Sequence, residues 1–246
     1  MAKPHLLLLP GRALLRHGSK LDEARQGEGG EGDGWENAMV SMSEVLGGKG
    51  LRGGVQISLS HHFTSLHVVA PPPVYLAGEE MRGWLQSQLE KDYGTEAQTW
   101  QLGWEDVAPG RAVPVTSLRQ VQLEALHAQL ALAGLTASSI RPWFVAAWNH
   151  YGHRNLPNGP VWLAMLEPGR LLLARVIHKR LVHVGLNRMT DANIETQLAA
   201  ALSRQVLCLG EGEAGKVSNE VQVIAPEYSG AMVSSKRITP SWGALL

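Results

Sequence analysis

Two short runs early in the chain alternate apolar with polar side chains. Residues 55–59 do so strictly, whereas residues 63–69 are mixed on both faces. Period-two alternation in short β-branched runs predicts half-buried strands, and the mixed run predicts a strand nearer the centre of a sheet. His61 and His62 separate the runs and predict a solvated hairpin turn. The prolines at 71–73 end the second strand, because proline has no N–H to donate.

Apolar residues at intervals of three and four predict helices in longer segments. The expected helices are 35–46, 77–93, a helix at 118–135 capped by Ser117, a short helix at 143–151, and 192–209. The further strands expected are two at 5–17 around a Pro10–Gly11 turn, then 97–104, 112–116, 138–142, 161–167, 170–178, 180–188 and 220–225. Glycine-rich or polar composition predicts loops at 21–34, 150–160 and 211–218, the first of them mobile.

The order of these elements repeats along the chain. Strand meanders, each followed by a helix and a strand, predict a duplicated α/β unit with mixed sheets. The 246 residues are enough to bury one large core or two smaller ones. From about residue 160 the sequence changes to three apolar strands joined by short turns. This change divides the chain into a predicted first α/β lobe at residues 1–157 and a second, smaller lobe at residues 158–246.

Composition narrows the classes of function. The 22 basic and 22 acidic residues give a formal charge of zero, which argues against an electrostatic nucleic-acid binder. Only 18% of the residues are charged, and eight are tryptophan. Tryptophan is enriched at protein interfaces, so this composition indicates a protein partner, although we expect most of the tryptophans in the core.

The single cysteine, Cys208, excludes an internal disulfide framework and a zinc site built from several thiolates. It lies in the apolar run QVLCLG, where we expect a buried, inert thiol. The apolar run at 6–9 ends at Pro10 and predicts no signal peptide. No segment has the roughly 20 apolar residues that span a bilayer. These patterns predict a cytoplasmic protein.

Three segments carry a resemblance to a known group of proteins. They are LSHHFTSLHVVAPP, YGTEAQTWQLGWEDV and LEALHAQLALAGLTASSIRPWFVAAWNHY, in this order within the duplicated layout. The chain resembles the cytoplasmic actin-like assembly proteins of type IV pili and type II secretion, the PilM and GspL families, over residues 6–225. The resemblance implies an actin-like (ribonuclease H-like) fold, truncated relative to actin-like ATPases. It also implies a scaffold that holds the cytoplasmic part of a membrane-anchored partner, and so a peripheral place at the inner membrane.

The resemblance directs attention to two phosphate-binding turns. In actin-like ATPases, each turn supplies an Asp and small residues, whose amides hold phosphate while the carboxylate orders the hydrated metal. The first such turn here, LPGRALL, has Gly11 but no Asp, and Arg12 is its only charge. The second, LAMLEPGRLLLA, has Glu167 and Gly169 but no Ser or Thr after them. Nucleotide hydrolysis is therefore not expected, and no cofactor is predicted.

Other chemical motifs are weak. GEGEAGKVS at 210–218 approaches the phosphate loop G-x-x-x-x-G-K-[ST], but a valine replaces the hydroxyl and two glutamates would repel phosphate. His178 and His183 are expected on adjacent strands and could face each other, but no spaced Cys/His pattern accompanies them. No G-x-S-x-G motif is present. The acidic pairs at 79–80 and 105–106 are sequence neighbours, which point apart on a helix.

Three functional hypotheses remain open. The leading one is a non-catalytic scaffold that binds a cytoplasmic segment of an inner-membrane pilus or secretion protein, by strand addition or in a groove between lobes. It involves no nucleic acid and no direct membrane insertion, and a homodimer is compatible with it. The second is a degenerate nucleotide-binding regulator with ATP between the lobes, which open space beneath Gly11 and Gly169 would favour. The third is a two-metal hydrolase, which needs clustered carboxylates that residues 55–59 and 63–69 lack. The candidate interface residues are Trp84, Trp100, Trp104, Trp143 and Trp148.

Overall fold

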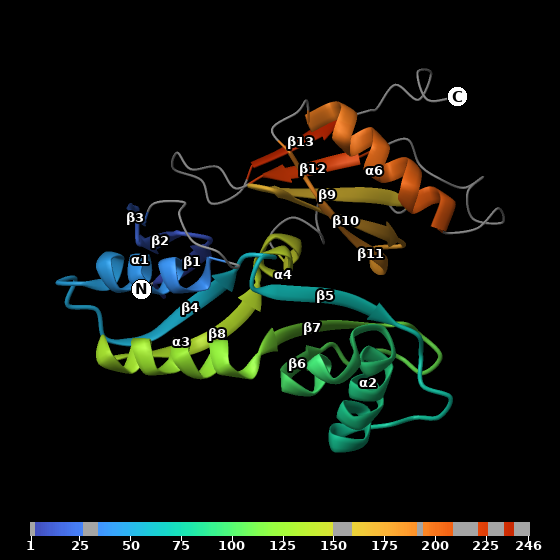
Figure 1. Cartoon of the computed structure of the whole chain (residues 1–246), viewed down its shortest axis with the longest axis horizontal. Coiled ribbons are helices and arrows are strands. Elements are labelled where there is room, and N and C mark those ends of the chain that lie inside the picture. Colours follow the sequence, from blue (N-terminus) through green and yellow to red (C-terminus); the bar gives the residue numbers. More distant parts are fainter. Residues whose placement is uncertain are drawn as a thin grey trace. The chain divides into compact units, whose positions relative to one another are not determined.

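The computed structural model describes residues 3–26, 34–149, 159–190, 194–208, 221–225 and 234–238. The chain divides into two units, Met1–Ala146 and Ala147–Leu246, and each is described by itself (Figure 1). The predicted loop at 211–218 and most of the stretch 150–160 lie outside the described residues. Among the described residues, no helix is long and apolar enough to cross a membrane.

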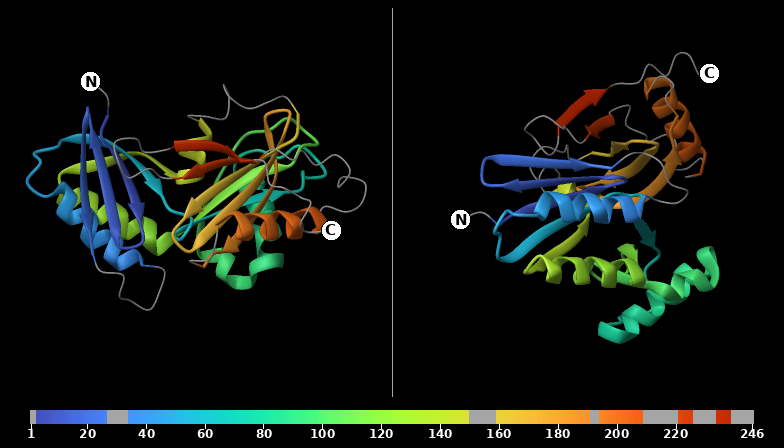
Figure 2. Two further views of the ribbon diagram at one scale, coloured as in Figure 1. Left: turned by 90° about the horizontal axis from the view of Figure 1, so that it is seen from above. Right: turned by 60° about the vertical axis from the view of Figure 1, so that its left-hand side comes forward.

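A five-stranded mixed sheet forms the centre of the first unit. Its order is β3-β2-β1-β4-β8, in which β2 is antiparallel to β1 and β3, whereas β4 is parallel to β1 and β8. Helices α1 and α3 contact each other and lie on the same face of this sheet (Figure 2, right). The elements are β1 (His5–Leu9), β2 (Arg12–His17), β3 (Lys20–Arg25), α1 (Trp35–Leu46), β4 (Gly53–Leu59), α3 (Gln120–Leu132) and β8 (Leu135–Pro142).

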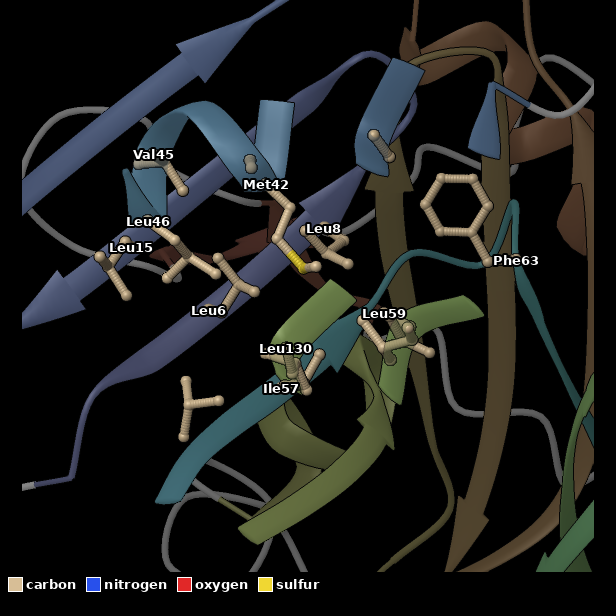
Figure 3. Packing of buried hydrophobic residues seen from close by; sticks show 14 of the residues in the cluster. Leu6, Leu8, Leu15, Met42, Val45, Leu46, Ile57, Leu59, Phe63 and Leu130 are labelled. Carbon is tan, nitrogen blue, oxygen red and sulfur yellow. The ribbon is translucent and has the colours of Figure 1, made fainter. Parts of the chain in front are cut away.

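The main core of the first unit lies between this sheet and the two helices. The strand β1 reads HLLLL without alternation because both of its faces are buried. Leu8 belongs to the core beneath the helices, while Leu7 is 2% exposed on the other face. Met42 of α1 points toward Leu8, and Ile57 of β4 and Leu130 of α3 join the same cluster (Figure 3).

A three-stranded sheet is inserted between β4 and α3. Its order is β5-β7-β6, and both pairs are antiparallel. Helix α2 covers one face, where its Leu85 packs with Val113 and Val115 of β7. The strand β7 continues directly into α3, and its Leu118 belongs to the core of the five-stranded sheet. The elements are β5 (Thr64–Val69), α2 (Gly78–Tyr93), the 3₁₀ helix η1 (Gly94–Thr99), β6 (Trp100–Trp104) and β7 (Val113–Arg119).

The predicted hairpin between residues 55–59 and 63–69 is wrong, although both segments are strands. β4 is interior to the five-stranded sheet, whereas β5 is an edge strand of the small sheet and not a central one. Ser60 turns the chain from one sheet to the other. Its N–H donates to the Leu8 carbonyl (2.9 Å), and its own carbonyl accepts from the Thr64 N–H (3.1 Å). Because β1 and β8 already pair with both edges of β4, β5 has no place beside it.

Two further expectations are corrected. Residues Lys20–Arg25 form the strand β3 and not part of a loop. This strand lies at an edge of the sheet, where charged side chains are common, and its Glu23 forms an ion pair with Arg12 of β2 (2.7 Å). Ser117 lies within β7 and does not cap the following helix. The residue before α3 is Arg119, whose backbone is extended (φ −61°, ψ 132°).

The second unit repeats the strand order of the first, which confirms the predicted duplicated α/β unit with mixed sheets. Its order is β11-β10-β9-β12-β13: an antiparallel meander, the helix α6, and then β12 parallel to β9. β13 is antiparallel to β12, whereas β8 is parallel to β4. Leu198 and Leu202 of α6 pack over Trp162, and the side chain of Cys208 lies outside the described residues. The elements are β9 (Val161–Glu167), β10 (Arg170–Ile177), β11 (Arg180–Arg188), α6 (Ile194–Cys208), β12 (Val221–Ala225) and β13 (Ser234–Ile238).

The turn between β10 and β11 has a strained backbone. His178 and Lys179 have positive φ (49° and 59°), a region that asparagine and glycine favour in two-residue hairpin turns. We expect His178→Asn combined with Lys179→Gly to raise the free energy of unfolding by about 1–2 kcal/mol, because side chains strain this conformation. Urea denaturation followed by circular dichroism measures the change. A control with alanine at both positions keeps the strain and should gain nothing. An equal gain in both variants would contradict the strain.

Candidate partner-binding site

The hairpin turn between β1 and β2 is filled by its own chain. Gly11 has a φ of 61°, and its carbonyl accepts hydrogen bonds from the Gln26 N–H (2.8 Å) and the Ser41 hydroxyl (3.1 Å). A Cβ added at Gly11 would lie 3.1 Å from the Gln26 carbonyl oxygen. Arg12, the only charge of this turn, forms its ion pair with Glu23. The turn therefore has little room beneath Gly11 for a ligand.

The hairpin turn between β9 and β10 is open at its glycine. Gly169 has a φ of 73°, and beyond its chain neighbours no heavy atom lies within 4 Å of a Cβ added there. Its carbonyl accepts a hydrogen bond from the Met189 N–H (2.9 Å), and Glu167 is 6% exposed. Open space beneath both glycines would favour the nucleotide-binding hypothesis, and it is present at Gly169 and not at Gly11.

The three-stranded sheet gathers aromatic side chains on the face that α2 covers. Three predicted interface residues lie here, Trp84 on α2 and Trp100 and Trp104 on β6, all half-buried against the apolar core. Tyr93 of α2, which is 47% exposed, and His67 of β5 join them through ring contacts with Trp100. We call these five residues the aromatic layer.

Two cations lie over tryptophan rings of the aromatic layer. The guanidinium carbon of Arg82 is 5.7 Å from the ring centroid of Trp104, and Lys91 Nζ is 5.9 Å from that of Trp84. Such contacts contribute about 0.5–1 kcal/mol each at exposed sites. The two cations hold tryptophan rings that are half-buried and partly accessible. Tryptophan, tyrosine and arginine are the side chains that most often contribute a large share of the binding energy at interfaces.

His67 connects the elements that carry the aromatic layer. It stacks on Trp100, with 6.1 Å between centroids and 15° between planes, and meets Tyr93 edge-on at 5.1 Å. Its Nδ1 is 3.3 Å from the Tyr93 hydroxyl, and its Nε2 is 3.5 Å from the Ser117 hydroxyl. Burial lowers the pKa of His67 to about 4, although the nearby Asp92 raises it. A neutral imidazole therefore links β5, β6 and α2 at neutral pH.

The other two predicted interface residues lie outside the aromatic layer. Trp143 begins the helix α4 (Trp143–Ala147) and is 2% exposed, and Trp148 follows this helix and is half-buried. The ring of Trp143 is 6.3 Å from that of His61. His61 is only 3% exposed, so the expectation that it is solvated is wrong. The structure brings together Trp84, Trp100 and Trp104 of the five candidates.

The histidines near β11 do not face each other. His178 lies in the turn before β11, whereas His183 on the strand is hydrogen-bonded to Gln205 of α6. The expectation that both histidines lie on strands is therefore wrong for His178, which lies in the turn between β10 and β11. Within the ranges that the structure describes, no group of three or more His, Cys, Asp or Glu residues is arranged to hold a metal ion.

Comparisons with known proteins identify the fold of the chain. No family model and no curated protein sequence matches the chain. A structure of a PilM–PilN type IV pilus biogenesis complex matches with a TM-score of 0.59 and 15% identity, over 83% of this chain and 66% of that chain. The cytoplasmic domain of EpsL, an inner membrane component of the type II secretion system of Vibrio cholerae, matches with a TM-score of 0.56 and 14% identity, over 91% of this chain and 82% of that chain.

A third solved structure extends the comparison. A protein of Bacteroides thetaiotaomicron with an actin-like ATPase fold and unknown function matches with a TM-score of 0.55 and 7% identity, over 84% of this chain and 76% of that chain. These identities make the likeness one of fold. They confirm the expected resemblance to assembly proteins of type IV pili and type II secretion at that level. The protein has the actin-like ATPase fold, which it shares with a type IV pilus biogenesis complex and with a type II secretion component.

Proposed function

We propose that this protein is a non-catalytic adaptor on the cytoplasmic side of a pilus-type or secretion-type assembly, where it binds a cytoplasmic segment of a membrane-anchored protein. The observation that carries the proposal is the aromatic layer on a sheet inserted into an actin-like fold. The fold is shared with a PilM–PilN complex and with the cytoplasmic domain of EpsL. Both are parts of assemblies, which supports a binding role over a metabolic one.

The two hairpin turns support a role without catalysis. The turn at Gly11 has no carboxylate before the glycine, and the Gln26 carbonyl oxygen closes the space beneath it. The turn at Gly169 has room but no hydroxyl after the glycine. Phosphoryl transfer depends on positioned amides and a metal held by acidic and hydroxyl groups. This chain lacks that set at both turns.

The partner segment is proposed to add as a strand beside the aromatic layer. In the order β5-β7-β6, the strands β5 and β6 each have one edge that no described strand pairs with. An extended segment along β6 would take its main-chain hydrogen bonds from that edge and pack its apolar side chains between Trp100 and Trp104. Lys91 over Trp84 favours an acidic residue in the segment, whereas Arg82 over Trp104 already forms an ion pair with Glu79 (3.4 Å).

The test is capture of membrane proteins from detergent-solubilised membranes of the source cells. We expect Tyr93→Ala combined with Trp104→Ala to reduce capture of a defined membrane protein at least tenfold. The two substitutions remove aromatic contact area and let water into the proposed interface. Tyr75→Ala is the matched control, since Tyr75 is 75% exposed and lies outside the aromatic layer. Arg82→Glu is a second variant that keeps the rings and reverses the charge. Unchanged capture by the Tyr93→Ala, Trp104→Ala variant and by Arg82→Glu, with folding verified by circular dichroism, would contradict the proposed surface.

A second candidate function, a nucleotide-binding regulator without turnover, is favoured by the open space beneath Gly169 alone. Calorimetric titration with ATP and magnesium separates the two. No heat is expected for the adaptor. Micromolar, magnesium-dependent binding of ATP that Gly169→Val abolishes would favour the regulator over the adaptor. Sedimentation velocity on the same sample tests whether the protein forms a homodimer, which adaptor and regulator would both allow.

A further inference from the structure

Helix α3 is apolar on its outer side as well as on its inner side. Leu126 and Leu130 face the sheet and are fully buried. On the opposite side, Val121 is 68% exposed and Leu132 is 81% exposed. Ala125 and Ala128, also exposed, lie between them at helical spacing, so the four residues form one stripe. Polar residues separate this outer stripe from the buried side of α3, and an exposed apolar stripe of this kind is a candidate surface for a partner.

Helix α1 extends this apolar stripe across to a second helix. Gln129 of α3 donates a hydrogen bond from Nε2 to Ser43 Oγ of α1 at 2.5 Å, which ties the two helices together. Val40, one turn before Ser43, is 51% exposed. The helices lie side by side on one face of the sheet (Figure 2, right). We call the stripe of Val121, Ala125, Ala128 and Leu132 together with Val40 the α1/α3 face.

The charged side chains that α1 and α3 themselves carry have one sign. Neither helix contains a lysine or an arginine, whereas Glu36, Glu44 and Glu124 are all exposed. Glu44 accepts from Gln26 and Glu124 from Gln120, both neutral side chains, so these contacts leave the negative charge in place. Two nearby cations point to other acids, since Lys49 pairs with Asp22 (2.8 Å) and Arg119 with Glu96 (2.7 Å).

We propose that the α1/α3 face docks a basic amphipathic helix of a partner protein. A partner helix can lay its apolar side along the stripe and place lysines or arginines beside the glutamates. The stripe from Val121 to Leu132 covers eleven steps, about 16 Å, which fits about three turns of a helix. This docking surface is separate from the aromatic layer, and the inference does not rest on the proposed function.

Charge decides against the other occupants of the α1/α3 face. A second copy of this chain would bring glutamates against glutamates, since the same face carries no basic residue. An anionic membrane surface attracts basic segments and repels acidic ones. An extended strand gains its affinity from the main chain of a sheet edge, which a helical surface does not offer.

The probe for this inference is a synthetic 18-residue amphipathic peptide of leucine and lysine, titrated into the full chain and followed by fluorescence anisotropy. We expect micromolar binding that weakens at least tenfold in the double variant Val121→Lys, Leu132→Lys. The matched control is Val182→Lys, Leu186→Lys, which alters a valine and a leucine that are exposed on β11 and should leave binding unchanged. Circular dichroism verifies that both variants are folded.

Two further measurements test the sign of the charge. A peptide with glutamate in place of lysine should not bind, and Glu36→Gln with Glu124→Gln should weaken the lysine peptide about three- to fivefold and flatten its salt dependence. No binding of the lysine peptide would overturn the proposal. So would equal binding to the Val121→Lys, Leu132→Lys variant, equal binding of the glutamate peptide, or binding of the chain to phosphatidylserine vesicles through this face.

Discussion

Replacing Met42 by alanine is expected to lower the free energy of unfolding by about 2–4 kcal/mol. Met42 is fully buried, and its side chain points from α1 toward Leu8 of β1 (Figure 3). Truncation removes buried methylene groups and the sulfur, and it leaves a cavity between helix and sheet that the neighbours fill only in part. Urea denaturation, with the midpoint and the slope both measured, gives the change in free energy.

The control for Met42→Ala lies two residues away on the same helix. Val40 is 51% exposed, so Val40→Ala should change the free energy of unfolding by no more than about 0.5 kcal/mol. Both substitutions act on α1 and change its intrinsic helix propensity by less than about 1 kcal/mol. Similar losses for the two variants would contradict the face that α1 turns toward the sheet.

Acidification from pH 7 to pH 4 is expected to cost about 2–3 kcal/mol of stability through His67 alone. In the unfolded chain His67 takes up a proton near its ordinary pKa of 6.5, whereas burial in the folded chain lowers this pKa to about 4. Between these values the unfolded state binds more protons. The contribution of His67 is therefore fully present above pH 6.5 and is lost as the pH falls toward 4.

The variant His67→Phe isolates this pH dependence. Phenylalanine keeps a ring beside Trp100 and Tyr93 but does not titrate, so stability measured by urea denaturation should fall less steeply between pH 6.5 and pH 4. The comparison is needed because burial also lowers the pKa of His5, with Arg16 and Arg141 acting in the same direction. The same slope in the variant and in the unaltered protein would contradict a neutral, buried His67.

The local pattern predicts most of the elements but not the pairing of β4 with β5. Helices α1 and α2 appear where periodicity places them, and the meander of β9 to β11 appears where apolar runs separated by short turns place it. The hairpin expectation fails because strand pairing depends on which edges are free, and β4 is enclosed by β1 and β8. The sequence pattern does not predict β3 at Lys20–Arg25, because an edge strand can be rich in charged residues and needs few apolar ones.

The candidate site follows the sequence only in part. Trp84, Trp100 and Trp104 are predicted interface residues, and the structure gathers them because α2 and β6 pack around one small core. His67 and Tyr93 are not predicted as site residues. Alternation marks His67 as a strand residue and helical spacing marks Tyr93 as a helix residue. Their contact depends on the pairing of β5 with β7, which no local pattern encodes.

The continuity of β7 and α3 has a mechanical consequence. Arg119 ends the strand and Gln120 begins the helix, so no loop separates them. Leu118, at the end of this strand, is anchored in the core of the large sheet. A pulling force on the small sheet would therefore reach α3 along one uninterrupted backbone, with no slack segment to absorb it. The two sheets of the first unit are therefore mechanically coupled, and a force on the small sheet is expected to displace the large one.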